Sequence, residues 1–232
     1  MWGPRRIGLF GGTFNPIHNG HLHVADVVRE QVHLDRILFI PSGLPPHKQA
    51  AVCAPAHHRL AMLQHALSEH PYYEVSDLEC RRSETSYTIH TVEQLRRALP
   101  EDDLFFMIGA DAFSELSSWK EAERLLTLCH FVIVTRPGAR FTSCPNLPIL
   151  NALDRSALWE MDRGARDVYT FTTVEGVRLS FFRTTTRPIS AREIRERVAA
   201  GQSVRRLLPV RVASYIIENG LYQDRLPSTQ VS

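Results

Sequence analysis

Short, fully apolar runs alternate along the chain with longer stretches whose apolar residues recur at helical spacing. The apolar runs predict strands at 7–10, 37–40, 104–108, 131–134 and 177–182, with a weaker strand at 73–75. The amphipathic stretches between them predict helices near 22–32, 57–69, 88–99 and 112–126. Strands that are apolar on both faces and alternate with helices are typical of a buried parallel sheet. The sequence therefore predicts an α/β fold, a doubly wound parallel sheet with helices on both faces.

Two parts of the chain depart from this alternation. Residues 138–176 lack a clear period, which indicates an irregular insertion or a lid. Beyond the last strand, a capping box that begins at Ser190 and a stop at Gly201 predict a helix, and another helix follows it. We expect residues 1–187 to form the main domain and residues 188–232 to form a small C-terminal helical tail of the same unit.

The composition narrows the class of protein. The 232 residues are 44% apolar and 22% charged, and 27 Lys and Arg face 25 Asp and Glu. A net charge of +2 excludes a broad basic surface for nucleic acid or membrane, but it leaves room for a small basic pocket. No apolar run approaches the ~18 residues of a membrane helix, and no signal peptide is recognisable. The four cysteines are too sparse for a disulfide scaffold, so we expect a cytoplasmic protein.

The segment most informative about chemistry is 11–21, GGTFNPIHNGH, which lies between the first strand and the first helix. In a doubly wound sheet, ligands bind at the carboxyl ends of strands, beside helix N-termini that favour anions. The adjacent Gly11 and Gly12 allow the backbone to approach a bulky anion. The segment is neither the dinucleotide fingerprint nor the P-loop. It carries His18 and His21 instead, three residues apart, so that both side chains can point the same way.

These histidines could also be structural or could bind a metal. A single histidine is more often a core or surface residue than a ligand, but a pair after a Gly-Gly turn at a sheet edge favours a site. A metal site is the second alternative, because His18, His21 and His23 lie close together. No Cys, Asp or Glu at the spacing of zinc ligands completes such a set.

The segment 11–21 resembles the GGTFDPIHxGH signature of the HxGH nucleotidylyltransferases, with Asn15 where Asp is usual. Later segments resemble motifs of bacterial nicotinate-mononucleotide adenylyltransferases: PPHK at 45–48, SYT at 86–88, IGAD at 108–111 followed by Trp119, TRPG at 135–138 and ISAREIR at 189–195. The last motif is usually ISSTxIR, so Ala191 and Arg192 replace two hydroxyl residues. The resemblance spans about 7–222 and implies a Rossmann-like fold.

The resemblance also implies an activity and a set of site residues. The implied reaction is adenylyl transfer from ATP to nicotinate mononucleotide, which gives nicotinate adenine dinucleotide and pyrophosphate in NAD biosynthesis. The implied catalytic residues are His18, His21 and Arg195. The implied ATP contacts are Gly11, Gly12, Thr13, Phe14, His18, His21, Ser190, Ile194 and Arg195. The implied mononucleotide contacts are Asn15, Lys48, Thr88, Gly109, Asp111, Trp119 and Arg136.

These residue types suit the chemistry of adenylyl transfer. The attacking phosphate is already largely ionised at pH 7, because its second pKa is about 6, so the reaction requires no general base. The protein must align two polyanions and neutralise the charge on the leaving group. Magnesium is expected on the substrate phosphates, with no metal site made by the protein.

Other functions stay open at the level of the sequence. A second adenylyltransferase of the same group would act on nicotinamide mononucleotide or pantetheine phosphate. A non-catalytic nucleotide sensor would need the same phosphate loop without the transfer residues. The sequence leaves open the preference for an acid or an amide, and the formation of a homo-oligomer.

Overall fold

The computed structural model describes residues 3–43, 53–82, 84–135, 138–184 and 189–223. The strands in these ranges are β1 (Arg6–Gly12), β2 (Arg36–Pro41), β3 (Tyr73–Val75), β4 (Asp103–Gly109), β5 (His130–Val134), β6 (Val168–Thr172) and β7 (Arg178–Phe182). The α-helices are α1 (Asn19–Val32), α2 (Ala56–Leu67), α3 (Thr88–Ala98), α4 (Ala110–Ser114), α5 (Ala122–Leu128), α6 (Arg155–Asp162), α7 (Ala191–Ala199) and α8 (Val210–Glu218).

The seven strands form one sheet in the order β3-β2-β1-β4-β5-β7-β6. Every neighbouring pair is parallel except β6 and β7, which are antiparallel. Successive side chains of a strand point to opposite faces of the sheet, so each central strand contributes side chains to the core on both faces. In β4, Phe106 and Ile108 belong to one core cluster, whereas Phe105 and Met107 belong to the other. This is why the apolar runs of the sequence do not alternate with polar residues.

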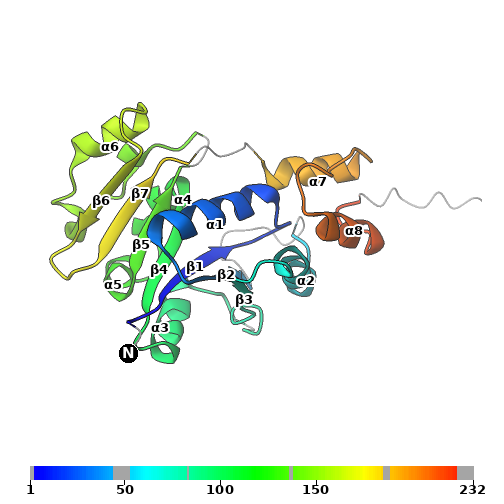
Figure 1. Ribbon diagram of the computed structural model, residues 1–232, viewed down its shortest axis with the longest axis horizontal. Helices are drawn as coiled ribbons and strands as arrows, with labels where there is room; N and C mark the ends of the chain where they lie inside the picture. The colour runs from blue at the N-terminus through cyan, green and yellow to red at the C-terminus, as the bar shows by residue number, and fades with distance from the viewer. Residues whose placement is uncertain (1–2, 44–52, 83, 136–137, 185–188, 224–232) are drawn as a thin grey trace, which may run out of the picture.

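Helices cover both faces of this sheet, as the sequence predicts. Buried residues of α3, α4, α5 and α6 join one core cluster, and those of α1, α2, α7 and α8 join the other. Figure 1 shows α1 crossing in front of the central strands, while α7 and α8 lie beyond the carboxyl end of β1, with α8 packed against α2. The α/β, doubly wound fold is therefore confirmed. None of the helices in the described ranges is long and apolar enough to cross a lipid bilayer.

The helix predicted over 112–126 is interrupted. Helix α4 ends at Ser114, a 3-10 turn covers Leu116–Ser118, and α5 begins only after Glu121, whose φ of 52° lies in the left-handed region. Leu116 is nevertheless fully buried, like Leu125 in α5. The turns between α4 and α5 keep their apolar side chains on the core side. The spacing of apolar residues in the sequence therefore does not reveal where the helix is interrupted.

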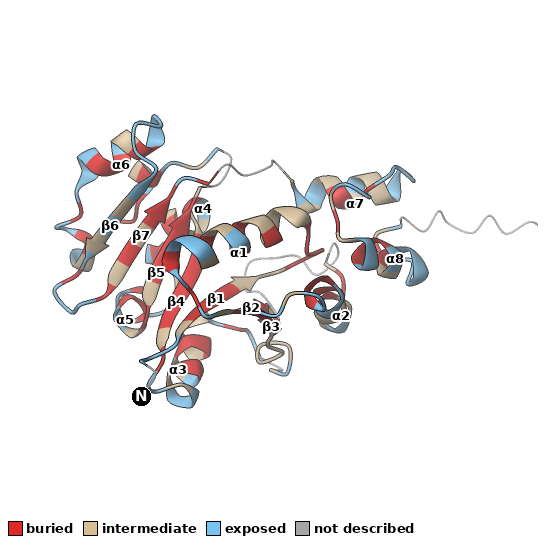
Figure 2. Ribbon diagram, in the orientation of Figure 1, coloured by how far each residue is buried: buried red, intermediate tan, exposed pale blue. Residues whose placement is uncertain are grey.

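The stretch 138–176 is more regular than the sequence indicates, since it contains α6 and β6. The expectation of an irregular insertion was wrong there. The Asp154 carboxylate caps α6 by accepting hydrogen bonds from the backbone N–H groups of Ser156 (2.9 Å) and Ala157 (3.3 Å). Strand β6 is an edge strand with exposed and half-buried positions, as Figure 2 shows. An edge strand needs few apolar residues, so its sequence carries a weak signal.

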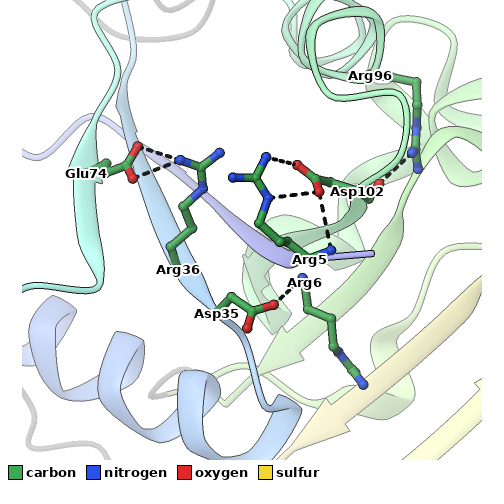
Figure 3. A network of polar contacts seen from close by, with 7 residues as sticks. All are labelled: Arg5, Arg6, Asp35, Arg36, Glu74, Arg96 and Asp102. Carbon is green, nitrogen blue, oxygen red and sulfur yellow. Dashed lines mark hydrogen bonds and ion pairs between the residues drawn. The ribbon is translucent and has the colours of Figure 1, made fainter. Parts of the chain in front are cut away.

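Polar contacts tie together the amino ends of the central strands (Figure 3). The Arg5 guanidinium donates to both carboxylate oxygens of Asp102, at 3.1 and 2.7 Å. The backbone N–H of Arg6 donates to Asp35 at 2.6 Å, and Arg36 pairs with Glu74 at 2.9 Å. These residues lie at the starts of the strands, so the opposite, carboxyl edge of the sheet is left for a ligand.

Candidate active site

A cleft of about 1280 Å³ lies at the carboxyl ends of β1 and β4. Its walls include the starts of three helices, α1, α3 and α7, whose N-cap residues are His18, Tyr87 and Ser190. The first turns of α1 and α3 contain no acidic residue. The free N–H groups and the helix dipoles at these ends favour anions. The cleft is therefore suited to phosphate or carboxylate groups at more than one point.

His18 and His21 form a stacked pair on one wall of the cleft. Their ring centroids lie 3.7 Å apart with an angle of 20° between the planes, which confirms that both side chains point the same way. His18 is 2% exposed. The edge of the Phe14 ring meets His21 at 5.1 Å. The pair is thus held by packing before any ligand binds.

Two glycines of the loop make this packing possible. A Cβ atom at Gly20 would lie 3.0 Å from Nδ1 of His18 and 3.4 Å from Cβ of Ile189, so glycine allows both to approach. A Cβ atom at Gly12 would lie 3.1 Å from the Phe14 ring. The sequence predicts that Gly12 makes room for an anion, whereas in the structure the space beside it holds an aromatic ring of the same loop.

Asn15 is a structural centre of the loop 11–21, which carries the histidine pair. It is 8% exposed, and its backbone carbonyl accepts a hydrogen bond from Nη1 of Arg195 at 2.8 Å. Its side-chain Oδ1 accepts two more, from the backbone N–H of Ala54 at 3.0 Å and from the Tyr222 hydroxyl at 2.7 Å. Arg195, predicted as a catalytic residue, is therefore positioned by the loop that carries the histidine pair.

Arg59 of α2 is a residue that sequence reasoning missed. It is 2% exposed and donates to the backbone carbonyls of Ala54 (3.0 Å), Thr13 (2.9 Å) and Gly43 (3.2 Å). These bonds connect the loops that follow β1 and β2. A signal exists in the sequence: position 59 shares the buried face of α2 with Met62, one turn away. An arginine on an apolar face requires internal partners.

Five of the predicted mononucleotide contacts line the same cleft, Asn15 among them. Thr88, Gly109, Asp111 and Trp119 all line it. The Trp119 ring meets Phe106 edge-on at 6.2 Å and 80°. Trp119 follows the 3-10 turn between α4 and α5, so the break in the predicted helix is what turns it toward the cleft.

Four further charged residues that line the cleft were not predicted: Glu79, Glu115, Lys120 and Glu193. Lys120 lines the cleft, with Nζ 4.8 Å from the centroid of the Tyr87 ring and 3.3 Å from Nε2 of His90. Glu79 also lines it and accepts a hydrogen bond from the Thr91 hydroxyl at 2.8 Å. Burial raises the pKa of the Glu79 carboxyl above its usual range.

The cleft gathers most, but not all, of the predicted residues. The predicted ATP contacts that line it are Gly11, Gly12, Thr13, Phe14, His18, His21, Ser190 and Arg195. Ile194 is fully buried and lies outside the lining, because its position in α7 faces the core. Lys48 and Arg136 fall outside the described residues.

The predicted capping box of α7 is only partly present. The helix begins where the sequence predicts, with Ser190 as N-cap, but the Ser190 side chain makes no capping hydrogen bond. Glu193 pairs with Arg197 at 2.8 Å instead of reaching back to the N-cap. Ser190 itself lines the cleft.

The described part of the chain offers no ready metal cage. Among those residues, no group of three or more His, Cys, Asp or Glu side chains could hold a metal ion. The four cysteines are unpaired with one another, and burial raises the pKa of the Cys129 thiol to about 12. The cleft lining thus combines histidine, arginine, lysine and helix N-termini with the carboxylates of Glu79, Asp111, Glu115 and Glu193.

This combination of fold and cleft agrees with the comparison to known protein families. The family model described as cytidylyltransferase-like matches residues 9–197. The chain therefore belongs to the cytidylyltransferase-like family.

Curated relatives define the group more narrowly. The chain is 40% identical over 220 residues to a Geotalea daltonii protein named "Probable nicotinate-nucleotide adenylyltransferase", a match that covers 94% of this chain and 99% of the relative. A Syntrophotalea carbinolica protein of the same name is 40% identical over 224 residues, with coverage of 95% and 98%. Within its family, the chain belongs with the nicotinate-nucleotide adenylyltransferases.

Solved structures support the fold independently. Plasmodium falciparum nicotinic acid mononucleotide adenylyltransferase complexed with NaAD matches with a TM-score of 0.70 and 19% identity, covering 94% of this chain and 97% of that one. The same enzyme complexed with APC gives a TM-score of 0.68, also at 19% identity, with the same coverage. At this identity the likeness concerns the Rossmann-like fold alone.

Proposed function

We propose that this protein transfers the adenylyl group of ATP to nicotinate mononucleotide. An oxygen of the mononucleotide phosphate attacks the α-phosphorus of ATP. The bond from that phosphorus to the bridging oxygen breaks, and pyrophosphate leaves with its electron pair. The products are nicotinate adenine dinucleotide and pyrophosphate, a step of NAD biosynthesis.

One observation carries this proposal: a single cleft contains the stacked histidines, Arg195 and three helix N-termini, with Trp119 at its other end. Its volume of about 1280 Å³ exceeds the roughly 300–1,000 Å³ of pockets for one small ligand. Two phosphate-bearing molecules therefore have room to lie end to end.

The ATP end of the cleft supplies positive charge and donors. In this proposal His21 contacts the α-phosphate. His18, which stacks on the His21 ring, contacts the ATP phosphates as well. Arg195 and Ser190 contact the leaving pyrophosphate at the start of α7. The loop 11–14 approaches the nucleotide with its backbone. Donors that are already in place stabilise the charge that builds up in the transition state, because they need no reorganisation.

The mononucleotide end recognises the pyridine ring and its carboxylate. Trp119 stacks on the ring, a contact of roughly 1–3 kcal/mol by analogy with base stacking. The N–H groups at Thr88, where α3 begins, donate to the carboxylate, and Asp111 hydrogen-bonds a ribose hydroxyl. Gly109 and Asn15 border the same molecule, and Lys48 and Arg136 approach its phosphate.

The remaining properties follow from the same proposal. Magnesium bound to the ATP phosphates would supply charge that offsets theirs, while His18, His21 and Arg195 position the phosphates. Residues 1–187 and 188–232 act as one unit, since Ile194, Val212 and Ile17 share a core cluster. The protein works in the cytoplasm, on small molecules and not on nucleic acid or membranes.

A direct assay tests the proposed reaction. The purified protein is incubated with ATP, magnesium and either nicotinate mononucleotide, nicotinamide mononucleotide or pantetheine phosphate, and pyrophosphate release is measured. We expect the fastest release with nicotinate mononucleotide, because helix N–H groups favour a carboxylate over a neutral amide. A chelator is expected to stop the reaction and added magnesium to restore it.

Each alternative outcome points to a different function. Release that is faster with one of the other two substrates would assign the enzyme to that substrate. ATP binding without release for any substrate would favour the nucleotide sensor. Mass spectrometry of the product distinguishes adenylyl transfer from simple hydrolysis of ATP.

A further inference from the structure

Residues 219–223, which follow the last helix, return to the loop 11–21 that carries the histidine pair. Helix α8 ends at Glu218, and Tyr222 follows four residues later with a φ of 61°, in the left-handed region. Its hydroxyl donates to Oδ1 of Asn15 at 2.7 Å, across 207 positions of sequence. Arg195 donates to the backbone carbonyl of the same asparagine at 2.8 Å. Asn15 thus joins three distant segments at one residue.

The chemistry of the amide determines the direction of these hydrogen bonds. The backbone N–H of Ala54 can only donate, so the Asn15 atom that faces it at 3.0 Å is the oxygen. The same oxygen faces Tyr222, which must therefore donate its hydroxyl proton. Burial raises the pKa of the Tyr222 hydroxyl, so this donor keeps its proton throughout the physiological range.

We propose that Tyr222 is a positioning residue for Arg195, acting through Asn15, and that the C-terminal segment thereby sets the affinity of the enzyme for ATP. Tyr222 does not touch the reacting atoms in this proposal. Its hydrogen bond holds the Asn15 side chain, and the Asn15 carbonyl in turn orients the Arg195 guanidinium toward the cleft that Arg195 lines. The inference rests on the proposed function only for the role of Arg195.

The side chain at position 15 acts as a hydrogen-bond acceptor in this arrangement. Its oxygen accepts from Tyr222 and from Ala54, so both of its lone pairs are used. A carboxylate at the same position would accept equally well, which explains why Asn can stand where the signature of the family has Asp. What the position requires is an acceptor and not a charge.

The test compares Tyr222→Phe with a matched control, Tyr215→Phe. Tyr215 is also a partly buried C-terminal tyrosine, but its hydroxyl bonds with Nδ1 of His58 at 2.9 Å and it does not line the cleft. The affinity for Mg·ATP is measured by calorimetry, and KM for each substrate is measured in the pyrophosphate assay. We expect Tyr222→Phe to weaken ATP binding about tenfold, which is about 1.4 kcal/mol, because Arg195 is no longer held in the orientation in which it meets the phosphates. KM for the mononucleotide, which Asn15 also borders, should rise less than the dissociation constant for ATP, and Tyr215→Phe should leave both values unchanged.

A double-mutant cycle separates positioning from simple stabilisation. If Tyr222 acts through Arg195, then Tyr222→Phe has little further effect on ATP affinity in an Arg195→Met background. Effects that add in the double variant, or equal effects of Tyr222→Phe and Tyr215→Phe, would overturn the proposal. The ATP affinity measured by calorimetry does not depend on catalysis. It therefore tests the role of Tyr222 whatever the identity of the second substrate.

Discussion

At the scale of single residues, the histidine pair combines two properties that rarely occur together. His18 is almost fully buried, yet it stacks on His21 at the wall of an open cleft. The stack, the Phe14 edge and the glycine at position 20 hold both rings before nucleotide binds. Preorganised donors of this kind stabilise a transition state without reorganisation of the site.

Removal of one ring should therefore affect catalysis far more than folding. We expect His21→Ala to lower kcat/KM at least 100-fold, about 2.7 kcal/mol, because the developing charge at the α-phosphate loses its donor. Steady-state kinetics measure the loss, and thermal unfolding should show a Tm close to that of the unchanged protein. His23→Ala is the control, since His23 lies on the same helix and outside the cleft lining. A decrease in kcat/KM of tenfold or less for His21→Ala would show that His21 is not a catalytic residue.

At the scale of elements, the cleft depends on loops that contact one another across the sheet edge. Gly43, after β2, lies against the segment around Glu79 and the start of α3: a Cβ atom there would lie 2.3 Å from the backbone oxygen of Glu79 and 3.0 Å from Oγ of Ser86. Backbone atoms cannot move aside cheaply, so glycine at this position sets the distance between the two segments. Arg59 then donates both to the Gly43 carbonyl and to the Thr13 carbonyl of the loop 11–21.

An added methyl group at this junction should disturb both stability and binding. We expect Gly43→Ala to lower the free energy of unfolding by about 1–3 kcal/mol, the usual cost of overpacking. Because Ser86 and Thr88 lie at the displaced end of α3, KM for the mononucleotide should rise more than KM for ATP. Urea denaturation and steady-state kinetics measure the two effects. Gly3→Ala is the matched control, since a Cβ atom at Gly3 meets nothing within 4 Å. An unchanged stability in Gly43→Ala would contradict the close approach.

At the scale of the whole molecule, the two edges of the sheet differ in structure. The carboxyl end carries the cleft, and the amino end carries the polar network of Arg5, Asp102 and their neighbours. The Arg5 guanidinium, which donates to Asp102, holds the pKa of that carboxyl below its usual range. The network therefore supports the scaffold through electrostatics, at a distance from the chemistry.

This separation predicts a pH dependence of stability that leaves activity alone. The folded-state pKa of Asp102 is lowered, so its contribution is complete above the unfolded value of about 3.9 and is lost as the pH falls through the folded value. We expect Asp102→Asn to lower the urea midpoint at pH 6, and the difference from the unchanged protein to shrink as the pH falls toward 3. Activity at pH 7 of the folded variant should be unchanged. Asp77→Asn, which removes an exposed pair with Arg81, should show no such convergence.

The local features of the fold could be predicted from the sequence, and the distant contacts could not. The strands, most helix bounds and the direction of the histidine pair follow from the spacing of neighbouring residues, which local geometry controls. The break before Trp119 and the edge strand β6 were missed, because apolar spacing continues across a turn and an edge strand needs little apolar surface. Arg59 was missed because a buried arginine is defined by the carbonyls of three other segments.

The sequence by itself determined the class of fold and located the loop that carries the histidine pair of the cleft. Periodicity reports which side of an element is buried, and a motif such as 11–21 keeps its chemistry within a single loop. Only the tertiary structure decided how that loop is held: Asn15 receives its hydrogen bonds from Ala54, Arg195 and Tyr222. The physical reason is that such bonds depend on distances of about 3 Å between segments far apart in the chain, which only the packed core establishes.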